Sequence, residues 1–276
     1  MKVAEFTLSA CVVALAAFIG LQVRDLRRIP AAPALQATVD DAPGTVDSAL
    51  ASPSASSSGN SYQRPSVIER SVMGSEPALE PGELRRRLRQ GGQGTYVDEL
   101  LLTRDSSVAR WPVRMTDPLR VWIDEPNALH DWSPEFPASV RDAFDTWTAT
   151  GIPMRFTFIR DSASADVHIR FLPRFPSGIS GKTLWSRNTG WWLVSGDIVL
   201  SLAHPGGGPV TALQMRAIAL HEVGHLLGLD HTADPTNIMS ARVRVRDLSD
   251  ADRATIRLLY SVPAGSTRSF PDTSEH

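Results

Sequence analysis

The sequence predicts an α+β fold, because strand-like segments are gathered in the first part of the globular region and the strongest helices follow at its end. Apolar and polar residues alternate in segments 119–123, 154–159 and 167–171, as they do in strands with one buried face. Segments 211–227 and 249–260 instead have the pattern of helices. The chain contains no internal repeat, so we expect these segments to share one domain.

One further helix and two further strands complete this expected domain. The helix is expected over 133–148, since Ser-Pro at its start is a helix-start signal and apolar residues follow at helical spacing. The strands are expected at 182–186 and within 191–202. The resulting order is one strand, a helix, four strands and two helices, with Ser249 and Asp250 as candidate N-caps of the last helix.

Composition excludes several classes of protein and of site. The chain has 276 residues, 42% of them hydrophobic and 21% charged, which is enough apolar material for a packed core. A net charge of −2 and a pI near 6.4 argue against a nucleic-acid partner held by bulk positive charge. The single cysteine, Cys11, excludes an intrachain disulfide and a zinc site built on several thiolates. Any metal site must therefore use histidines and carboxylates.

The region before the domain has the composition of an export signal followed by a tether. An apolar run at 6–23 predicts an N-terminal signal-anchor or signal peptide, which we place at 1–29. Residues 30–95 are rich in Pro, Ser and Ala and are expected to form a tether with short helices. The globular domain is then expected over 96–265, followed by a tail at 266–276.

This organisation predicts either a membrane-anchored protein with an extracytoplasmic domain or a secreted one, with the membrane contacted through the N-terminal segment. The charges on either side of the apolar run favour the opposite orientation. Lys and Arg are more numerous after the run, which by itself favours keeping that side in the cytoplasm. The short helices are expected at 80–90 and 95–104. The arginines of the first are expected to form a solvated face.

The candidate site lies in the first of the two late helices and in the turn after it. His221 and His225 are four residues apart, so both imidazoles share one helical face and can hold one metal ion. Glu222 lies beside that ion. Gly228 can adopt a left-handed conformation that ends the helix, after which His231 can approach as a third ligand. Three neutral histidines with an open fourth position are the geometry of a catalytic zinc site.

A weaker alternative is that the three histidines occupy a solvated helix face. Against it, the apolar flanks at 217–220 and 226–227 indicate that the helix is largely buried. Buried imidazoles need partners, and a shared metal ion is the simplest one. A chance match to three His, one Glu and one Gly at this spacing has a probability of roughly 1 in 10⁵ for a chain of this composition.

These residues resemble a known family. Residues 221–231 match the zinc-binding motif of the metzincin metallopeptidases, and Gly228-Leu229-Asp230-His231 looks most like the matrixin branch. Asn237-Ile238-Met239-Ser240 resembles the Met-turn of that clan, and segment 248–260 resembles the closing helix of matrixin catalytic domains. The resemblance covers about residues 108–262.

The resemblance implies a metzincin-like α+β fold: a twisted, mixed five-stranded sheet with an active-site helix and a C-terminal helix. It implies one catalytic Zn²⁺ bound by His221, His225 and His231. It also implies that Glu222 is the general base and that Met239 is a structural floor beneath the metal. This agrees with the chemistry expected of a catalytic zinc ion with a carboxylate beside it.

The expected substrate is a protein or peptide chain that pairs with an edge strand, for which segment 182–186 is our candidate. Calcium is possible, but the scattered carboxylates do not assign a site to it. His168 and His204 are isolated candidates for a second zinc site. The chain lacks a cysteine-switch motif and the Pro-x-Tyr stretch that follows the Met-turn in many matrixins. Latency and substrate preference are therefore left open.

Two functions of different classes are compatible with this site. The first is a zinc-dependent endopeptidase that hydrolyses peptide bonds with a zinc-activated water and Glu222 as general base. The alternative is a non-catalytic, zinc-stabilised peptide-binding module. Glu222 favours the endopeptidase, because a purely structural zinc site requires no carboxylate beside the metal.

Overall fold

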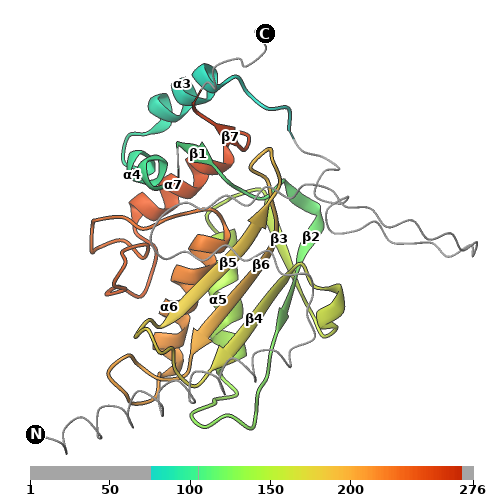
Figure 1. Ribbon diagram of the computed structural model, residues 1–276, viewed down its shortest axis with the longest axis vertical. Helices are drawn as coiled ribbons and strands as arrows, with labels where there is room; N and C mark the ends of the chain where they lie inside the picture. The colour runs from blue at the N-terminus through green and yellow to red at the C-terminus, as the bar shows by residue number, and fades with distance from the viewer. Residues whose placement is uncertain (1–75, 105, 269–276) are drawn as a thin grey trace, which may run out of the picture. The chain divides into compact units, whose positions relative to one another are not determined.

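The computed structural model describes residues 76–104 and 106–268, which fold around a five-stranded sheet (Figure 1). The strands of this sheet are β2 (Arg114–Ile123), β3 (Met154–Ile159), β4 (Val167–Leu172), β5 (Gly181–Arg187) and β6 (Leu193–Ser201). Their order across the sheet is β3-β2-β4-β6-β5, with β5 antiparallel to β6 and the other neighbours parallel. The expected mixed five-stranded sheet is confirmed, and β5 lies at its edge.

Two helices pack together beside this sheet (Figure 1). The packed pair is α5 (Phe136–Thr148) and α6 (Ala212–Leu226), and α6 contacts β5 and β6. The other elements are α3 (Pro81–Gly91), α4 (Val97–Thr103), β1 (Ser107–Val108), the short 3-10 helix η1 (Ser162–Ser164), α7 (Asp250–Tyr260) and β7 (Gly265–Ser266). Of these, α3, α4, β1, α7 and β7 lie together at one end of the sheet (Figure 1). Strands followed by helices along the chain make this an α+β fold, as predicted.

The ends of the late helices follow from local sequence. Thr211 caps α6 through a capping box with Gln214, and Ser249 caps α7 in the same way. Gly228 follows α6 with φ +102°, which places it in the left-handed region. A Cβ at this position would lie 2.1 Å from the carbonyl oxygen of Ala109, so only glycine fits the turn. The predicted cap at Ser249 and the predicted turn at Gly228 are both confirmed.

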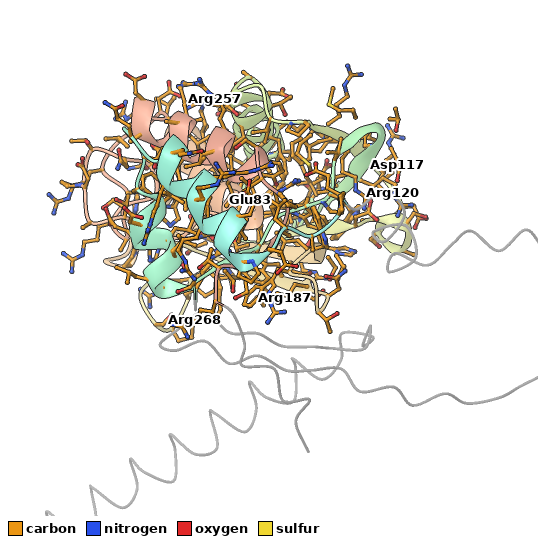
Figure 2. The ribbon with its side chains drawn as sticks, turned by 90° about the horizontal axis from the view of Figure 1, so that it is seen from above. Glu83, Asp117, Arg120, Arg187, Arg257 and Arg268 are labelled. Carbon is orange, nitrogen blue, oxygen red and sulfur yellow. The ribbon has the colours of Figure 1, made fainter. Side chains whose placement is uncertain are left out.

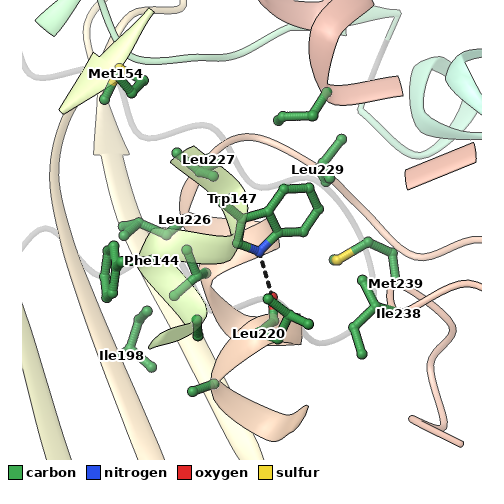
Figure 3. Close-up of a cluster of buried hydrophobic side chains, with 14 of the residues drawn as sticks. Phe144, Trp147, Met154, Ile198, Leu220, Leu226, Leu227, Leu229, Ile238 and Met239 are labelled. Atoms are coloured by element: carbon green, nitrogen blue, oxygen red, sulfur yellow. Dashed lines mark hydrogen bonds between the residues drawn. The ribbon is translucent and has the colours of Figure 1, made fainter. Parts of the chain in front are cut away.

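A buried junction joins α5, α6 and the segment that contains Met239 (Figure 3). The Trp147 indole N–H donates to the backbone carbonyl of Leu220 at 2.8 Å, so α5 is bonded to the backbone of α6. The Met239 side chain packs against α6 at Gly224, where a Cβ would lie 2.3 Å from the Met239 sulfur. The absence of a side chain at Gly224 therefore sets how closely the three elements approach.

The two helices that precede the sheet, α3 and α4, also contribute to the core. Helix α3 lies against α7 (Figure 2), and a Cβ on Gly91 would lie 2.5 Å from the Leu258 side chain. The side chains that α3 and α4 bury are Leu84, Leu88, Val97 and Leu100. The exposed face of α3 carries ion pairs between Glu83 and the side chains of Arg86 and Arg87. Both expected short helices are present. Helix α3 contributes to the core, although it lies within 30–95, the region expected to form the tether. The boundaries of tether, domain and tail stay predictions.

The predicted signal-anchor or signal peptide at 1–29 lies outside the described residues and stays a prediction. Among the helices of residues 76–104 and 106–268, none combines the length and the apolar character that a bilayer crossing needs.

Substitution of Gly224 by Ala tests the buried junction. We expect a loss of about 1–3 kcal/mol in the free energy of unfolding, because the new methyl group would overlap the Met239 sulfur and crowd the Trp147 ring. Gly82→Ala is the matched control, since a Cβ there meets nothing within 4 Å. Urea unfolding followed by circular dichroism measures both variants. Equal effects at the two positions would show that the junction tolerates a side chain.

Candidate metal centre

Three imidazoles from α6 and the loop after it meet at one point. The Nε2 atoms of His221 and His225 are 3.1 Å apart, those of His225 and His231 3.2 Å, and those of His231 and His221 3.3 Å. Zinc–nitrogen bonds of about 2.0–2.1 Å in a tetrahedron place ligand atoms roughly 3.3–3.4 Å apart. The observed triangle therefore has the size of one face of a tetrahedral zinc site.

Backbone carbonyls fix which ring nitrogen of each helical histidine carries the proton. His221 Nδ1 lies 2.7 Å from the carbonyl oxygen of Ile238, and His225 Nδ1 lies 3.0 Å from that of Leu229. A carbonyl oxygen can only accept, so both Nδ1 atoms donate and both Nε2 atoms keep their lone pairs. Lone pairs that face one another at this distance repel, and a cation between them fits the arrangement.

Burial keeps these imidazoles in the neutral form that binds metals. Desolvation lowers the pKa of His221 to about 4, against the opposing hydrogen bond to Ile238. Burial likewise lowers the pKa of His225 well below its ordinary value and lowers that of His231. At neutral pH the three rings are therefore uncharged ligands that need not release a proton before binding.

Glu222 lies on α6 with its carboxylate turned toward the edge strand β5. Its Oε2 accepts a 2.6 Å hydrogen bond from the Thr183 hydroxyl. Its Oε1 lies against the backbone of Gly181, where a Cβ would come within 2.4 Å. Burial raises the pKa of Glu222 to about 7, and the hydrogen bond from Thr183 opposes this shift. Glu222, which directly follows His221 in the sequence, thus has a buried carboxyl with a pKa near neutrality.

The segment containing Met239 is held in place by α7. Asp252 Oδ2 accepts from the backbone N–H of Ile238 and from that of Ser249, each at 2.8 Å. The carbonyl of the same Ile238 accepts from His221, so one residue links α7 to a candidate ligand. Met239 follows directly and packs on Gly224, next to His225 (Figure 3). The structure therefore brings Met239 against the helix that carries the paired histidines.

His168 and His204 do not join this cluster. His168 Nε2 lies 2.9 Å from the carbonyl of Ser162, and His204 Nε2 lies 3.1 Å from the side-chain oxygen of Gln214. Within the described part of the chain, only His221, His225 and His231 form a group of three or more potential metal ligands. A second zinc site and a calcium site stay unassigned.

Sequence reasoning did not single out Thr183, Gly181 or Arg104. Thr183 and Gly181 contact Glu222, and Arg104 donates to the Leu229 carbonyl that orients His225. A threonine at the start of an edge strand and an arginine after a short helix have no motif of their own. The one signal in the sequence is Gly181, directly before the strand predicted at 182–186, because a glycine in a strand often marks a place where another group approaches the backbone closely.

Comparison with known proteins agrees with this geometry. Residues 174–261, from before β5 to the end of α7, match the family model described as Matrixin. Metalloendoproteinase 1 of Glycine max is 29% identical over 174 residues, which cover 55% of this chain and 53% of that protein. Metalloendoproteinase 2-MMP of Arabidopsis thaliana is 28% identical over 190 residues, which cover 60% and 47% of the two chains. The chain therefore spans about half the length of the curated relatives it matches.

The matched region contains the elements that build the metal centre: the edge strand β5, the helix α6, the loop with His231, the segment at Met239 and the helix α7. The mixed five-stranded sheet of the described residues also agrees with the fold that the resemblance implied. The region that builds the metal centre is therefore similar to matrixins, in agreement with the metzincin resemblance that the spacing of its histidines indicated.

Proposed function

We propose that this protein is a zinc-dependent endopeptidase whose zinc ion is held by His221, His225 and His231. The observation that carries the proposal is the meeting of three imidazole Nε2 atoms, two of them on the same helix as the buried carboxyl of Glu222. The names of the matched plant relatives, which are metalloendoproteinases, support the same reaction class.

The residues divide the chemistry between them. Zinc, when bound, supplies Lewis-acid polarisation of a carbonyl group and acidification of a water molecule. His221, His225 and His231 would hold the ion, and no fourth potential ligand joins them in the described residues, as in catalytic rather than structural zinc sites. Glu222 supplies the group that exchanges protons. Its Oε2 is engaged by Thr183, which leaves Oε1 to receive the proton.

Proton transfer through Glu222 balances the hydrolysis. Glu222 removes one proton from the attacking water while the water oxygen bonds to the peptide carbon. The same carboxyl then delivers that proton to the amine nitrogen as the carbon–nitrogen bond breaks. A group whose pKa lies near 7 can do both at neutral pH.

The substrate is proposed to be a protein or peptide that adds to β5 as an extended strand. β5 pairs with β6 along one edge, and no strand of the described residues pairs with its other edge. Backbone pairing of this kind binds chains of varied sequence. Because Thr183 on β5 contacts Glu222, a peptide aligned on β5 is also aligned with the proton-exchanging group.

An extracytoplasmic location remains part of this proposal. Its support is the apolar run at 6–23, which lies outside the described residues.

Replacement of Glu222 by Gln separates the endopeptidase from a zinc-stabilised binding module. We expect cleavage of an unfolded protein substrate to fall by about 10²–10⁴-fold with zinc content unchanged, since the amide cannot exchange the proton. Cleavage is followed by fluorescence release and zinc by elemental analysis. Stoichiometric zinc with no cleavage by the unsubstituted protein would favour the binding module.

Removal of one ligand tests the metal site itself. We expect His225→Ala to lose most of its bound zinc and its cleavage activity, because two imidazoles hold zinc far less tightly than three. His130→Ala is the control, since its side chain is 92% exposed and lies outside the cluster. Both are compared by zinc content after dialysis and by loss of activity with a chelator. Equal zinc content in the two variants would contradict the site.

The hydroxyl of Thr183 is expected to position Glu222. Thr183→Val keeps the shape but removes the donor, and we expect kcat to fall about tenfold with little change in KM. Thr183→Ser restores the donor and should restore most of kcat. Ser186→Ala removes a hydroxyl from the same strand that pairs instead with Ser195, and it serves as control. A full rate in Thr183→Val would show that Glu222 needs no partner on β5.

A further inference from the structure

We infer that residues 96–104, called here the α4 segment, are a structural part of the metal centre. This segment precedes the region matched by the Matrixin model, yet it bonds to the groups that orient all three histidines. The inference rests on the proposed zinc site but not on peptide cleavage.

Arg104 reaches the groups that orient His225 and His231. Its Nη2 donates at 2.7 Å to the Leu229 carbonyl, which also accepts from His225 Nδ1. Its Nε lies 3.3 Å from Asp230 Oδ2, while Asp230 Oδ1 accepts from the backbone N–H of His231 at 2.7 Å. One guanidinium therefore fixes both a carbonyl and a carboxylate that each hold a candidate zinc ligand.

Tyr96 reaches the group that orients His221. Its hydroxyl donates at 3.0 Å to Asp252 Oδ1, and Asp252 Oδ2 accepts from the backbone N–H of Ile238. The Ile238 carbonyl accepts from His221 Nδ1. Tyr96 is buried, and its backbone N–H also donates to the Thr255 hydroxyl at 3.1 Å. The phenol is therefore held on α7 at the carboxylate that anchors Ile238.

Two further side chains of the segment hold the loop that carries His231. Thr103 Oγ1 donates to Asp230 Oδ2 at 3.0 Å. Glu99 Oε2 accepts from the backbone N–H of Ala233 at 2.7 Å. The loop is thus bonded to α4 on both sides of His231. Because His231 comes from a loop and not from α6, its position depends on these bonds more than those of the helical ligands do.

The ion pair between Arg104 and Asp230 is largely shielded from solvent, so the loss of either partner is costly. The Arg104 side chain is 9% exposed and its guanidinium lies 5.1 Å from the ring centre of Trp185 on β5. Removing either charged partner would leave the other buried and unpaired, which is strongly destabilising.

The α4 segment supports the site from outside and does not block it. In the described residues, none of its hydrogen bonds reaches an Nε2 atom of the three histidines or the carboxylate of Glu222. The bonds to Leu229, Asp230, Asp252 and Ala233 end on carbonyls, carboxylates and a backbone amide behind the ligands. Weakening the segment should therefore lower zinc affinity, whereas weakening an inhibitory segment would raise activity.

The test measures zinc affinity of full-length variants by competition with a chromogenic chelator. Arg104→Met keeps the apolar stem and removes the guanidinium, and we expect zinc to bind about 10–100-fold more weakly. Tyr96→Phe and Thr103→Val each remove one hydroxyl at nearly constant shape and are expected to weaken binding a few-fold. Controls are Leu102→Ala, at an 84% exposed side chain of the same helix, and Arg89→Met on the exposed face of α3.

The outcomes are distinguishable. Zinc binding by the unsubstituted protein, with all three variants binding like the controls, would overturn this inference and leave the zinc site intact. Increased cleavage by the variants would also overturn it and would mark the segment as inhibitory. Absence of zinc binding in the unsubstituted protein would remove the proposed function together with this inference. If circular dichroism shows that Arg104→Met does not fold, Tyr96→Phe and Thr103→Val decide the result.

Discussion

The arrangement depends on one electrostatic constraint, which is to hold three imidazole Nε2 atoms within 3.3 Å of one another, with the lone pairs of His221 and His225 face to face. Such a cluster is repulsive by itself, so each ring must be oriented by bonds on its far side. His221 and His225 use the carbonyls of Ile238 and Leu229 for this purpose. Both carbonyls lie in irregular segments whose own positions must be fixed by other elements. The close contacts at Gly224 and Gly228, the cap of α7 and the α4 segment provide that support.

The parts of this arrangement that depend on local spacing could be predicted from the sequence. Residues four apart share a helical face, a glycine permits a left-handed turn, and Ser249 with Asp252 three residues later forms a capping box. Each of these is decided within about one helical turn of chain. Alternation of apolar residues likewise placed the strands of the sheet, although not the order in which they pair.

The rest depends on contacts between distant residues that carry no pattern. Thr183 and Glu222 are 39 residues apart, Arg104 and Leu229 are 125, and Tyr96 and Asp252 are 156. A Thr, an Arg and a Tyr at these positions fit a solvated surface equally well when only their neighbours in sequence are considered. The arginines of α3 are in fact exposed, whereas Arg104 is buried, and local composition does not distinguish them. Burial of a charged side chain becomes visible only when the fold brings Asp230 to it.

The surroundings of two carboxyl groups on and after α6 shift their pKa values in opposite directions. Asp230 is paired with Arg104 and receives the His231 N–H, so its pKa stays below the ordinary value in spite of burial. Glu222 is buried with a hydroxyl as its partner, and its pKa rises to about 7. A carboxylate committed to a buried arginine cannot exchange protons near neutrality without losing that pairing, which suits it to holding the loop. The group near neutrality has no cationic side chain to release, which supports the proposed proton-exchanging role of Glu222 and a structural role for Asp230.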